Sequence, residues 1–349
     1  MKVVKLPSGN YNVQVYIGKG KDGKRLRKSF TGPDRARVLQ QAAAFADEHR
    51  TASDPDSFGV VLAKYIDMRT CVLSPSTIRS YVGIQSVLVA YYADFCRMPV
   101  WKITSDDVQS LVNSLVAPLD NVHGVKSRRK QLTVKTVRNY VGLISSVLKD
   151  AGYNMPNVRI PERIRPQLNV PDEVTMRRVI NASRGTDIEI PILLAATGPL
   201  RRGEICALKI SDFNGTVVHI HRDMVLTKDN VWTLRPPKTL SSDRYIDLPA
   251  DVVTLINERG SITDLTPDMI SSRFKALLRK NGIAPFRFHD IRHYCASMMK
   301  AKNIPDIYIQ QRGGWATNNT LNNIYTHTLQ NQSVIMTNVI NKELMRAIK

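Results

Sequence analysis

Two short motifs in the C-terminal half place positively charged side chains where they could bind an anion together. Arg201 and Glu204 lie three residues apart just after an apolar helical segment, so they would share one face of the next helix. His289 and Arg292 have the same spacing at the start of another helical pattern. Two cation-capable groups on one face suit a phosphate. A surface ion pair at a helix start would explain the first motif equally well.

Two further residues could do chemistry but carry little weight alone. Residues 235–246 have strand-forming side chains on both sides of a polar turn, which predicts a hairpin that presents Lys238. Further along, Gly313-Gly314-Trp315 is followed ten residues after the tryptophan by Tyr325. An isolated lysine is rarely catalytic, and an isolated tyrosine is usually a packed core residue whose hydroxyl has one partner.

The order of these motifs resembles that of the tyrosine recombinase (phage integrase) family. The motifs are, in sequence order, T-G-x-x-R-x-x-E, a hairpin lysine, H-x-x-R, G-G-W and I-Y-T-H. The resemblance covers the C-terminal half of the chain. It implies a catalytic set of two arginines, a lysine, a histidine, a tryptophan and a nucleophilic tyrosine, namely Arg201, Arg292, Lys238, His289, Trp315 and Tyr325. Glu204 would orient its neighbours rather than react.

The chain departs from the family pattern in two places. The usual T-G-x-R is one residue longer here, and Glu204, three residues beyond Arg201, favours Arg201 over Arg202 as the catalytic arginine. Trp315 stands where the family usually has histidine, and its indole N–H can donate a hydrogen bond but cannot titrate.

These residue types suit cleavage of a phosphodiester without a cofactor. Two guanidiniums can clamp the non-bridging oxygens, while His289 accepts the proton of Tyr325 and Lys238 protonates the departing 5′-oxygen. The resemblance implies a 3′-phosphotyrosyl bond, which stores the energy needed for religation. We find neither a P-loop nor a carboxylate cluster for two metals. His219 and His221 share a strand face, for which a structural role is favoured over zinc.

Composition points to a nucleic-acid partner. Lys and Arg total 50 against 30 Asp and Glu, which gives a net charge of +20. The N-terminus lacks the apolar core of a signal peptide, and no apolar run approaches the length of a membrane span. Four cysteines without a C-x-x-C pair favour a reduced, cytoplasmic protein, in a bacterial cell or a phage-infected host.

The N-terminal residues predict a small basic hairpin followed by a helix. Residues 11–17 and 25–30 read as strands, and an Ala-rich helix should run from Pro33 to about Arg50. Six basic residues on the turn and the second strand are candidate DNA contacts: Lys19, Lys21, Lys24, Arg25, Arg27 and Lys28. A hairpin whose charges are merely solvated is the alternative.

Helical patterns dominate the next hundred residues. We expect helices over residues 58–69, 76–93 with Ser76 as N-cap, 104–116 with a capping box, and 133–151. A basic loop and the first turns of the last helix are candidate phosphate contacts, although a solvated loop is possible: Lys126, Arg128, Arg129, Lys130, Lys135 and Arg138. The Pro- and Arg-rich residues 154–171 predict an extended linker.

The resulting fold class is mainly α with small β elements (α+β). We predict an N-terminal β-sheet, arm-type DNA-binding domain over residues 1–52, a helical (SAM-like) core-binding domain over 57–153, and a mixed α/β catalytic domain over 172–349. In the last, helices are expected over 172–183 and 189–197, with strands between 217 and 247. Residues 333–349 form an amphipathic tail that could cover its own domain or, as the resemblance favours, dock in trans within a tetramer.

The sequence therefore predicts a site-specific integrase of a mobile element, such as a prophage or an integrative conjugative element. Its expected partners are double-stranded DNA with core-type and arm-type sites, further copies of itself in a tetramer, and in addition an excisionase and a DNA-bending protein. A type IB-like topoisomerase and a non-catalytic DNA-binding regulator are the alternatives. The basic N-terminal hairpin argues against the first, and the complete set of six site residues argues against the second.

Overall fold

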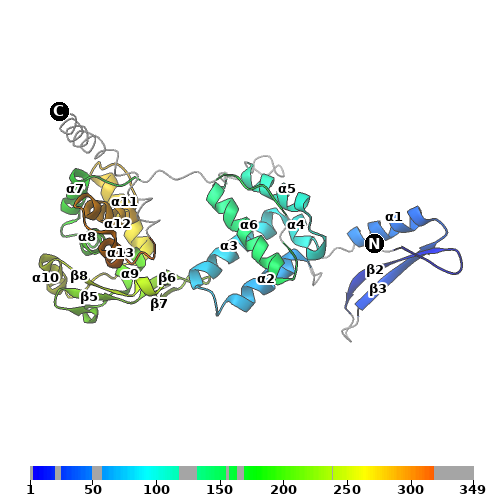
Figure 1. The fold of residues 1–349 in the computed structure, drawn as a ribbon, viewed down its shortest axis with the longest axis horizontal. Helices are drawn as coiled ribbons and strands as arrows, with labels where there is room; N and C mark the ends of the chain where they lie inside the picture. Colours follow the sequence, from blue (N-terminus) through cyan, green and yellow to red (C-terminus); the bar gives the residue numbers. More distant parts are fainter. Residues whose placement is uncertain are drawn as a thin grey trace, which may run out of the picture. The chain divides into compact units, whose positions relative to one another are not determined.

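The computed structural model describes residues 3–19, 25–48, 57–117, 132–154, 157–162, 169–237 and 239–317. The fold is mostly helical with small sheets, as expected (Figure 1). The chain divides into two compact units, Met1–Ile164 and Arg165–Lys349. The boundary between them falls inside the expected linker. Among the described residues, no helix is long and apolar enough to cross a membrane.

The N-terminal residues form a three-stranded antiparallel sheet with one helix packed on it. Strands β1 (Val3–Lys5), β2 (Tyr11–Lys19) and β3 (Arg25–Gly32) lie in sequence order, and α1 (Arg35–Glu48) contacts β2 and β3. Val13, Val15, Val38 and Ala42 are the buried core. The hairpin is confirmed and β1 is additional. The helix begins two residues after Pro33, where the Asp34 carboxylate accepts the backbone N–H of Ala36 at 2.8 Å.

A helical bundle follows, with its own core. Its elements are α2 (Phe58–Arg69), α3 (Pro75–Tyr91), α4 (Ala93–Arg97), the 3₁₀ turn η1 (Val100–Lys102), α5 (Ser105–Val116) and α6 (Val134–Asp150). The Thr104–Asp107 capping box is confirmed. The prediction of Ser76 as N-cap was wrong: Ser74 caps α3, because Pro75 fits the first helical position. Helix α3 also ends earlier than expected, and α4 is a separate helix.

The first residues of the expected linker are bound to this bundle. Val158 and Ile160 pack on its core, and the Arg159 N–H donates to the Gln109 side chain at 2.8 Å. Arg138 donates to the Pro161 carbonyl at 2.9 Å. The extended backbone expected from the prolines is therefore held in place by side chains of α5 and α6.

The second unit packs helices around two small sheets. Its elements are α7 (Glu173–Ser183), α8 (Glu189–Thr197), α9 (Arg202–Ala207), η3 (Ile210–Asp212), β4 (Phe213–Asn214), β5 (Val217–Ile220), β6 (Asp223–Leu226), β7 (Trp232–Arg235), η4 (Leu240–Ser242), β8 (Arg244–Asp247), α10 (Ala250–Arg259), α11 (Pro267–Lys280), α12 (Phe288–Ala301) and α13 (Asp306–Gly313). The very apolar α8 lies in the core, where Ile192, Leu194 and Ala195 are fully buried. Helices α9, α10 and α12 all contact α8.

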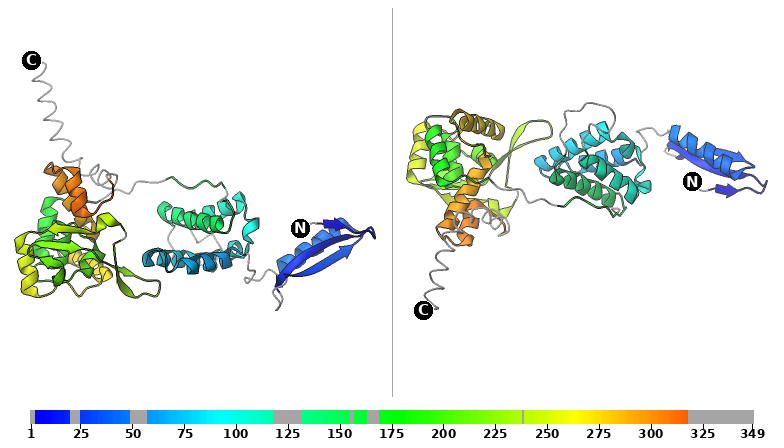
Figure 2. Two further views of the ribbon diagram at one scale, coloured as in Figure 1. Left: turned by 60° about the horizontal axis from the view of Figure 1, so that its bottom comes forward. Right: turned by 90° about the horizontal axis from the view of Figure 1, so that it is seen from above.

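The strands of this unit pair differently from the sequence prediction. We expected a hairpin across residues 235–246 with Lys238 on its turn, but β7 pairs with β6, and β8 pairs with β5. Lys238 itself lies outside the described residues. The prediction failed because β propensity marks strands without specifying their partners. Figure 2 shows β6 and β7 as a two-stranded ribbon that extends from the body of the unit.

Candidate active site

The candidate site forms where four segments meet: the start of one helix, the second turn of another, the start of a strand, and a turn. Arg201 is the N-cap of α9, and Arg244 begins β8. Arg292 lies in the second turn of α12. The turn that ends α13 contributes the backbone of residues 312–314 and the side chain of Trp315. Hydrogen bonds connect all four segments.

Arg201 and Glu204 are in direct contact. The backbone N–H of Arg201 donates to Glu204 Oε2 at 2.8 Å, which satisfies a free N–H at the start of α9, and its guanidinium donates to Oε1 at 2.5 Å. The guanidinium also reaches the Gly314 carbonyl at 3.2 Å. Arg202 turns away and donates to the Pro267 carbonyl at 3.1 Å. This geometry supports Arg201, rather than Arg202, as the arginine of the site.

Glu204 is a buried carboxylate surrounded by arginines. Arg244 donates to both of its oxygens, at 3.2 and 3.0 Å, and both side chains are almost fully buried. Burial opposes ionisation, but the charge and hydrogen bonds of Arg244, together with the charges of Arg201 and Arg292, outweigh it and lower the pKa of Glu204 to about 2. Glu204 is therefore ionised at neutral pH.

Arg292 is the most buried charged group of the site. Its side chain is 1% exposed and donates to the Pro199 carbonyl and, at 2.6 Å, to the Gly313 carbonyl. The guanidinium carbon lies 4.2 Å from the centre of a Trp315 ring, which is a cation–π contact. We expected Trp315 to serve as a phosphate donor; in this structure its ring also covers Arg292.

His289 lies in the first turn of α12, and the residue is exposed. Its ring meets that of His293 edge to face, with 4.8 Å between centroids. Partial burial, then His293 and the positive charges of Arg292 and Arg201, lower the pKa of His289 to about 4. The imidazole is therefore neutral at pH 7 and can accept a proton. Lys238 and Tyr325, the remaining two members of the expected set, lie outside the described residues.

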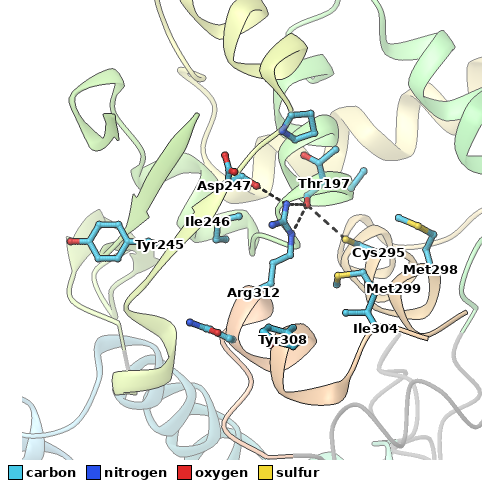
Figure 3. A pocket seen from close by; sticks show the side chains of 13 residues that line it. Thr197, Tyr245, Ile246, Asp247, Cys295, Met298, Met299, Ile304, Tyr308 and Arg312 are labelled. Carbon is cyan, nitrogen blue, oxygen red and sulfur yellow. Dashed lines mark hydrogen bonds between the residues drawn. The ribbon is translucent and has the colours of Figure 1, made fainter. Parts of the chain in front are cut away.

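Sequence reasoning missed two arginines that hold the site together. Arg244 was taken as part of a polar turn, yet it is 5% exposed and paired with Glu204. Arg312 donates to the carbonyls of Thr197, at 2.8 and 3.1 Å, and Asp247, at 2.9 Å, which joins α13 to the ends of α8 and β8 (Figure 3). One signal was available for Arg244: it alternates with the apolar Ile246 on the inward face of β8, where a charge needs a partner.

The candidate DNA-contacting residues lie apart from this cluster in the sequence. Lys28 and Lys135 are exposed, and Arg27 is exposed with a 3.3 Å contact to Gln14. Arg138 is partly buried against Pro161. The other candidates lie, wholly or with their side chains, outside the described residues: Lys19, Lys21, Lys24, Arg25, Lys126, Arg128, Arg129 and Lys130.

The two histidines near β5 contact carboxylates. His219 Nε2 lies 2.8 Å from Asp243 Oδ1, and its ring stacks on Tyr245 with 4.2 Å between centroids. His221 Nε2 lies 3.9 Å from an oxygen of Asp212. Within the described part of the chain, no three His, Cys, Asp or Glu side chains are grouped so that they could hold a metal ion.

Comparison with known proteins identifies the class. The sequence pattern of the phage integrase family matches residues 173–332. A tyrosine recombinase XerC-like protein of Caldanaerobacter subterraneus subsp. tengcongensis is 22% identical over 95% of both chains. The fold resembles the Tn1549 transposon integrase in complex with circular intermediate DNA, with a TM-score of 0.63, 14% identity, and coverage of 81% of this chain and 99% of that one. A lambda integrase tetramer bound to a Holliday junction gives a TM-score of 0.56 at 15% identity, covering 93% and 95%.

Over residues 173–332, the chain belongs to the phage integrase family of tyrosine recombinases. It is an enzyme that catalyses site-specific DNA recombination. The family match spans the positions of all six expected site residues, from Arg201 to Tyr325.

Proposed function

We propose that this recombinase integrates and excises a mobile element, such as a prophage or an integrative conjugative element. The observation that supports the chemistry best is the convergence of Arg201 and Arg292 on the adjacent carbonyl oxygens of Gly314 and Gly313. Guanidiniums held around one point can bind the non-bridging oxygens of a single phosphate. The positive charge that surrounds the buried Glu204 carboxylate favours that anion.

The proposed cleavage step is an exchange of one phosphate ester for another. The hydroxyl oxygen of Tyr325 attacks the scissile phosphorus, and its proton passes to the neutral His289. The bond from phosphorus to the 5′-oxygen breaks, and Lys238 gives that oxygen a proton. A 3′-phosphotyrosyl bond and a free 5′-hydroxyl result. Attack by the 5′-hydroxyl of another strand reverses the step without ATP.

Arg201 and Arg292 stabilise the charge that builds on the non-bridging oxygens, and Trp315 adds an indole donor. Glu204 orients Arg201 and does not react. Removing one such donor from a preorganised site typically costs a factor of about 10² to 10³ in rate. The site thus divides into residues that move protons and residues that hold the phosphate.

The rest of the chain is proposed to bring DNA and further copies to this site. Residues 1–52 bind arm-type sites, and residues 57–153 together with residues 172–349 bind core-type sites. The exposed Lys28 and Lys135 are candidate phosphate contacts. The tail of residues 333–349 docks in trans on a neighbouring protomer of a DNA-bound tetramer. An excisionase and a DNA-bending protein assist excision.

The test is covalent capture of the intermediate. A nicked suicide duplex that spans the joined ends of the encoding element is incubated with wild-type protein and Tyr325→Phe, and the products are separated under denaturing conditions. We expect a protein–DNA adduct with wild type and none with the variant. Salt-sensitive, sequence-specific binding without an adduct would favour a DNA-binding regulator instead.

Two further results would change the proposal. An adduct that persists in Tyr325→Phe would mean that another residue is the nucleophile. Relaxation of supercoiled DNA without any exchange between two marked duplexes would favour a type IB-like topoisomerase over an integrase.

A further inference from the structure

Arg244 is not a member of the expected catalytic set, but its guanidinium is hydrogen-bonded to several groups of the site. Its side chain is 3% exposed. It donates to both oxygens of Glu204, to the Arg312 carbonyl at 2.9 Å, and to the Ser242 carbonyl at 2.9 Å. All three nitrogens of its guanidinium donate to these protein acceptors, so Arg244 acts through the groups that it holds.

The first of these groups is the Glu204 carboxylate, which two arginines share. Glu204 Oε1 accepts from the guanidiniums of Arg201 and Arg244, and Oε2 accepts from the Arg201 backbone and from Arg244. Arg244 therefore binds the carboxylate from within the core. Arg201, whose side chain is 35% exposed, binds the same carboxylate from the side that faces solvent. Any rotation of the Glu204 side chain would move the guanidinium of Arg201.

Sharing the carboxylate also preserves positive charge. If Glu204 were paired with Arg201 alone, the pair would be neutral and Arg201 would attract a phosphate less strongly. The three arginines Arg201, Arg244 and Arg292 around one carboxylate leave a net charge of +2. This excess lies beside Arg201, whose side chain is 35% exposed, whereas Arg244 and Arg292 are buried.

The second group is the turn after α13. Three consecutive carbonyl oxygens each accept from a different arginine: Arg312 from Arg244, Gly313 from Arg292, and Gly314 from Arg201. Gly314 has a left-handed φ of +65°, and a Cβ there would lie 3.0 Å from a nitrogen of Arg244. The turn therefore packs directly on Arg244 and keeps its guanidinium in one orientation.

We propose that Arg244 is a positioning residue for DNA cleavage, which holds the guanidinium of Arg201 in place through Glu204. The inference rests on the proposed role of Arg201 in binding the scissile phosphate. It assigns to the start of β8 a function that the expected catalytic set does not include. A displacement of about 1 Å in a reacting constellation can cost a factor of about 100 in rate.

The experiment measures single-turnover cleavage of the suicide duplex at saturating protein, with the rate taken per DNA-bound complex. Arg244→Lys keeps the charge but cannot bridge both oxygens of Glu204 as a planar fork does. We expect its cleavage rate to fall about 100-fold, with a Kd for DNA within about threefold of wild type because the guanidinium nitrogens of Arg244 all donate to protein groups. Arg244→Gln, which also loses the charge, should be slower still.

Arg259→Lys is the matched control. Arg259 likewise donates to a carboxylate, that of Glu189, and to a carbonyl, that of Thr186 at 2.9 Å, but it lies on α10. Its replacement should leave the cleavage rate per complex unchanged. If Arg259→Lys slows cleavage as much as Arg244→Lys does, the loss reflects general damage to the unit, and the proposal is overturned.

Two variants that change Glu204 test whether Arg244 acts through this carboxylate. This test remains possible even if Arg244→Lys does not fold. If Arg244 acts through Glu204, Glu204→Gln alone and the neutral pair Glu204→Gln/Arg244→Met should cleave at the same slow rate, within about threefold. A much slower double variant would mean that Arg244 acts by another route. Wild-type cleavage by Arg244→Lys would overturn the proposal outright. An absence of adduct with the wild-type protein would instead defeat the proposed function.

Discussion

The charge of Glu204 should be a large, pH-dependent part of the stability of the second unit. Its pKa is lowered to about 2 in the fold, against an ordinary value of 4.5, because the pull of Arg244, Arg201 and Arg292 exceeds the burial that opposes ionisation. A carboxyl group with a lowered folded pKa stabilises the fold at pH values above its unfolded pKa. That stability is lost as the pH falls from about 4.5 towards 2.

The size of the effect follows from the two pKa values. Each pH unit between them corresponds to about 1.4 kcal/mol, so ionised Glu204 contributes about 3 kcal/mol at pH 7. At pH 3 the same linkage leaves about 1 kcal/mol. Glu204→Gln cannot ionise and leaves Arg244 buried without its anion, which independently predicts a loss of about 3 kcal/mol or more at pH 7.

The assay is urea unfolding followed by tryptophan fluorescence between pH 3 and pH 7. A Trp101→Phe background removes the one tryptophan of the first unit, so that Trp232 and Trp315 report on the second. In this background, the stability lost on Glu204→Gln substitution should shrink from about 3 to about 1 kcal/mol as the pH falls. A loss that stays constant over this range would refute the reasoning.

Two further predictions concern the same site. Because the pKa of His289 is lowered to about 4 in the DNA-free protein, the second-order rate constant of wild-type cleavage, measured with protein well below saturation, should decline only as the pH falls below about 5. The rate constant of His289→Gln should be lower and show no such decline, and a wild-type rate constant that already declines from pH 7 would contradict this. Gly314→Ala should destabilise the second unit by about 1–3 kcal/mol, because the φ of residue 314 is +65° and the new Cβ would lie 2.8 Å from the Ser241 carbonyl oxygen. The same urea unfolding assay measures this loss, and an unchanged unfolding midpoint would contradict the prediction.

Local signals in the sequence predicted the helices well. Helix α2 occupies residues 58–69 and α8 residues 189–197, as expected, because apolar spacing and breakers are properties of a short segment. The Thr104–Asp107 capping box was predicted from four residues. The cap of α3 was misplaced by two residues, since Ser74 and Ser76 both suit an N-cap and only Pro75 distinguishes them.

Pairings between distant segments were not predicted. The strand-forming residues on either side of Lys238 look like one hairpin, but β7 and β8 belong to different sheets. β-Propensity describes how a residue fits a pleated surface and contains no information about the partner strand. For the same reason, the alternation of Arg244 with Ile246 along β8 indicated an inward-facing side chain but did not identify its partner, Glu204, which is 40 residues away.

The sequence by itself determined the family resemblance and the order of the motifs, because residue types and short spacings are visible in the chain. It also determined the helix starts that hold Arg201 and His289. Only the tertiary structure decided that Arg244 shares Glu204 with Arg201, that Trp315 covers Arg292, and that three arginines bind three consecutive carbonyls. These contacts join residues up to 113 positions apart, and their free energy depends on burial that arises only when the core has formed.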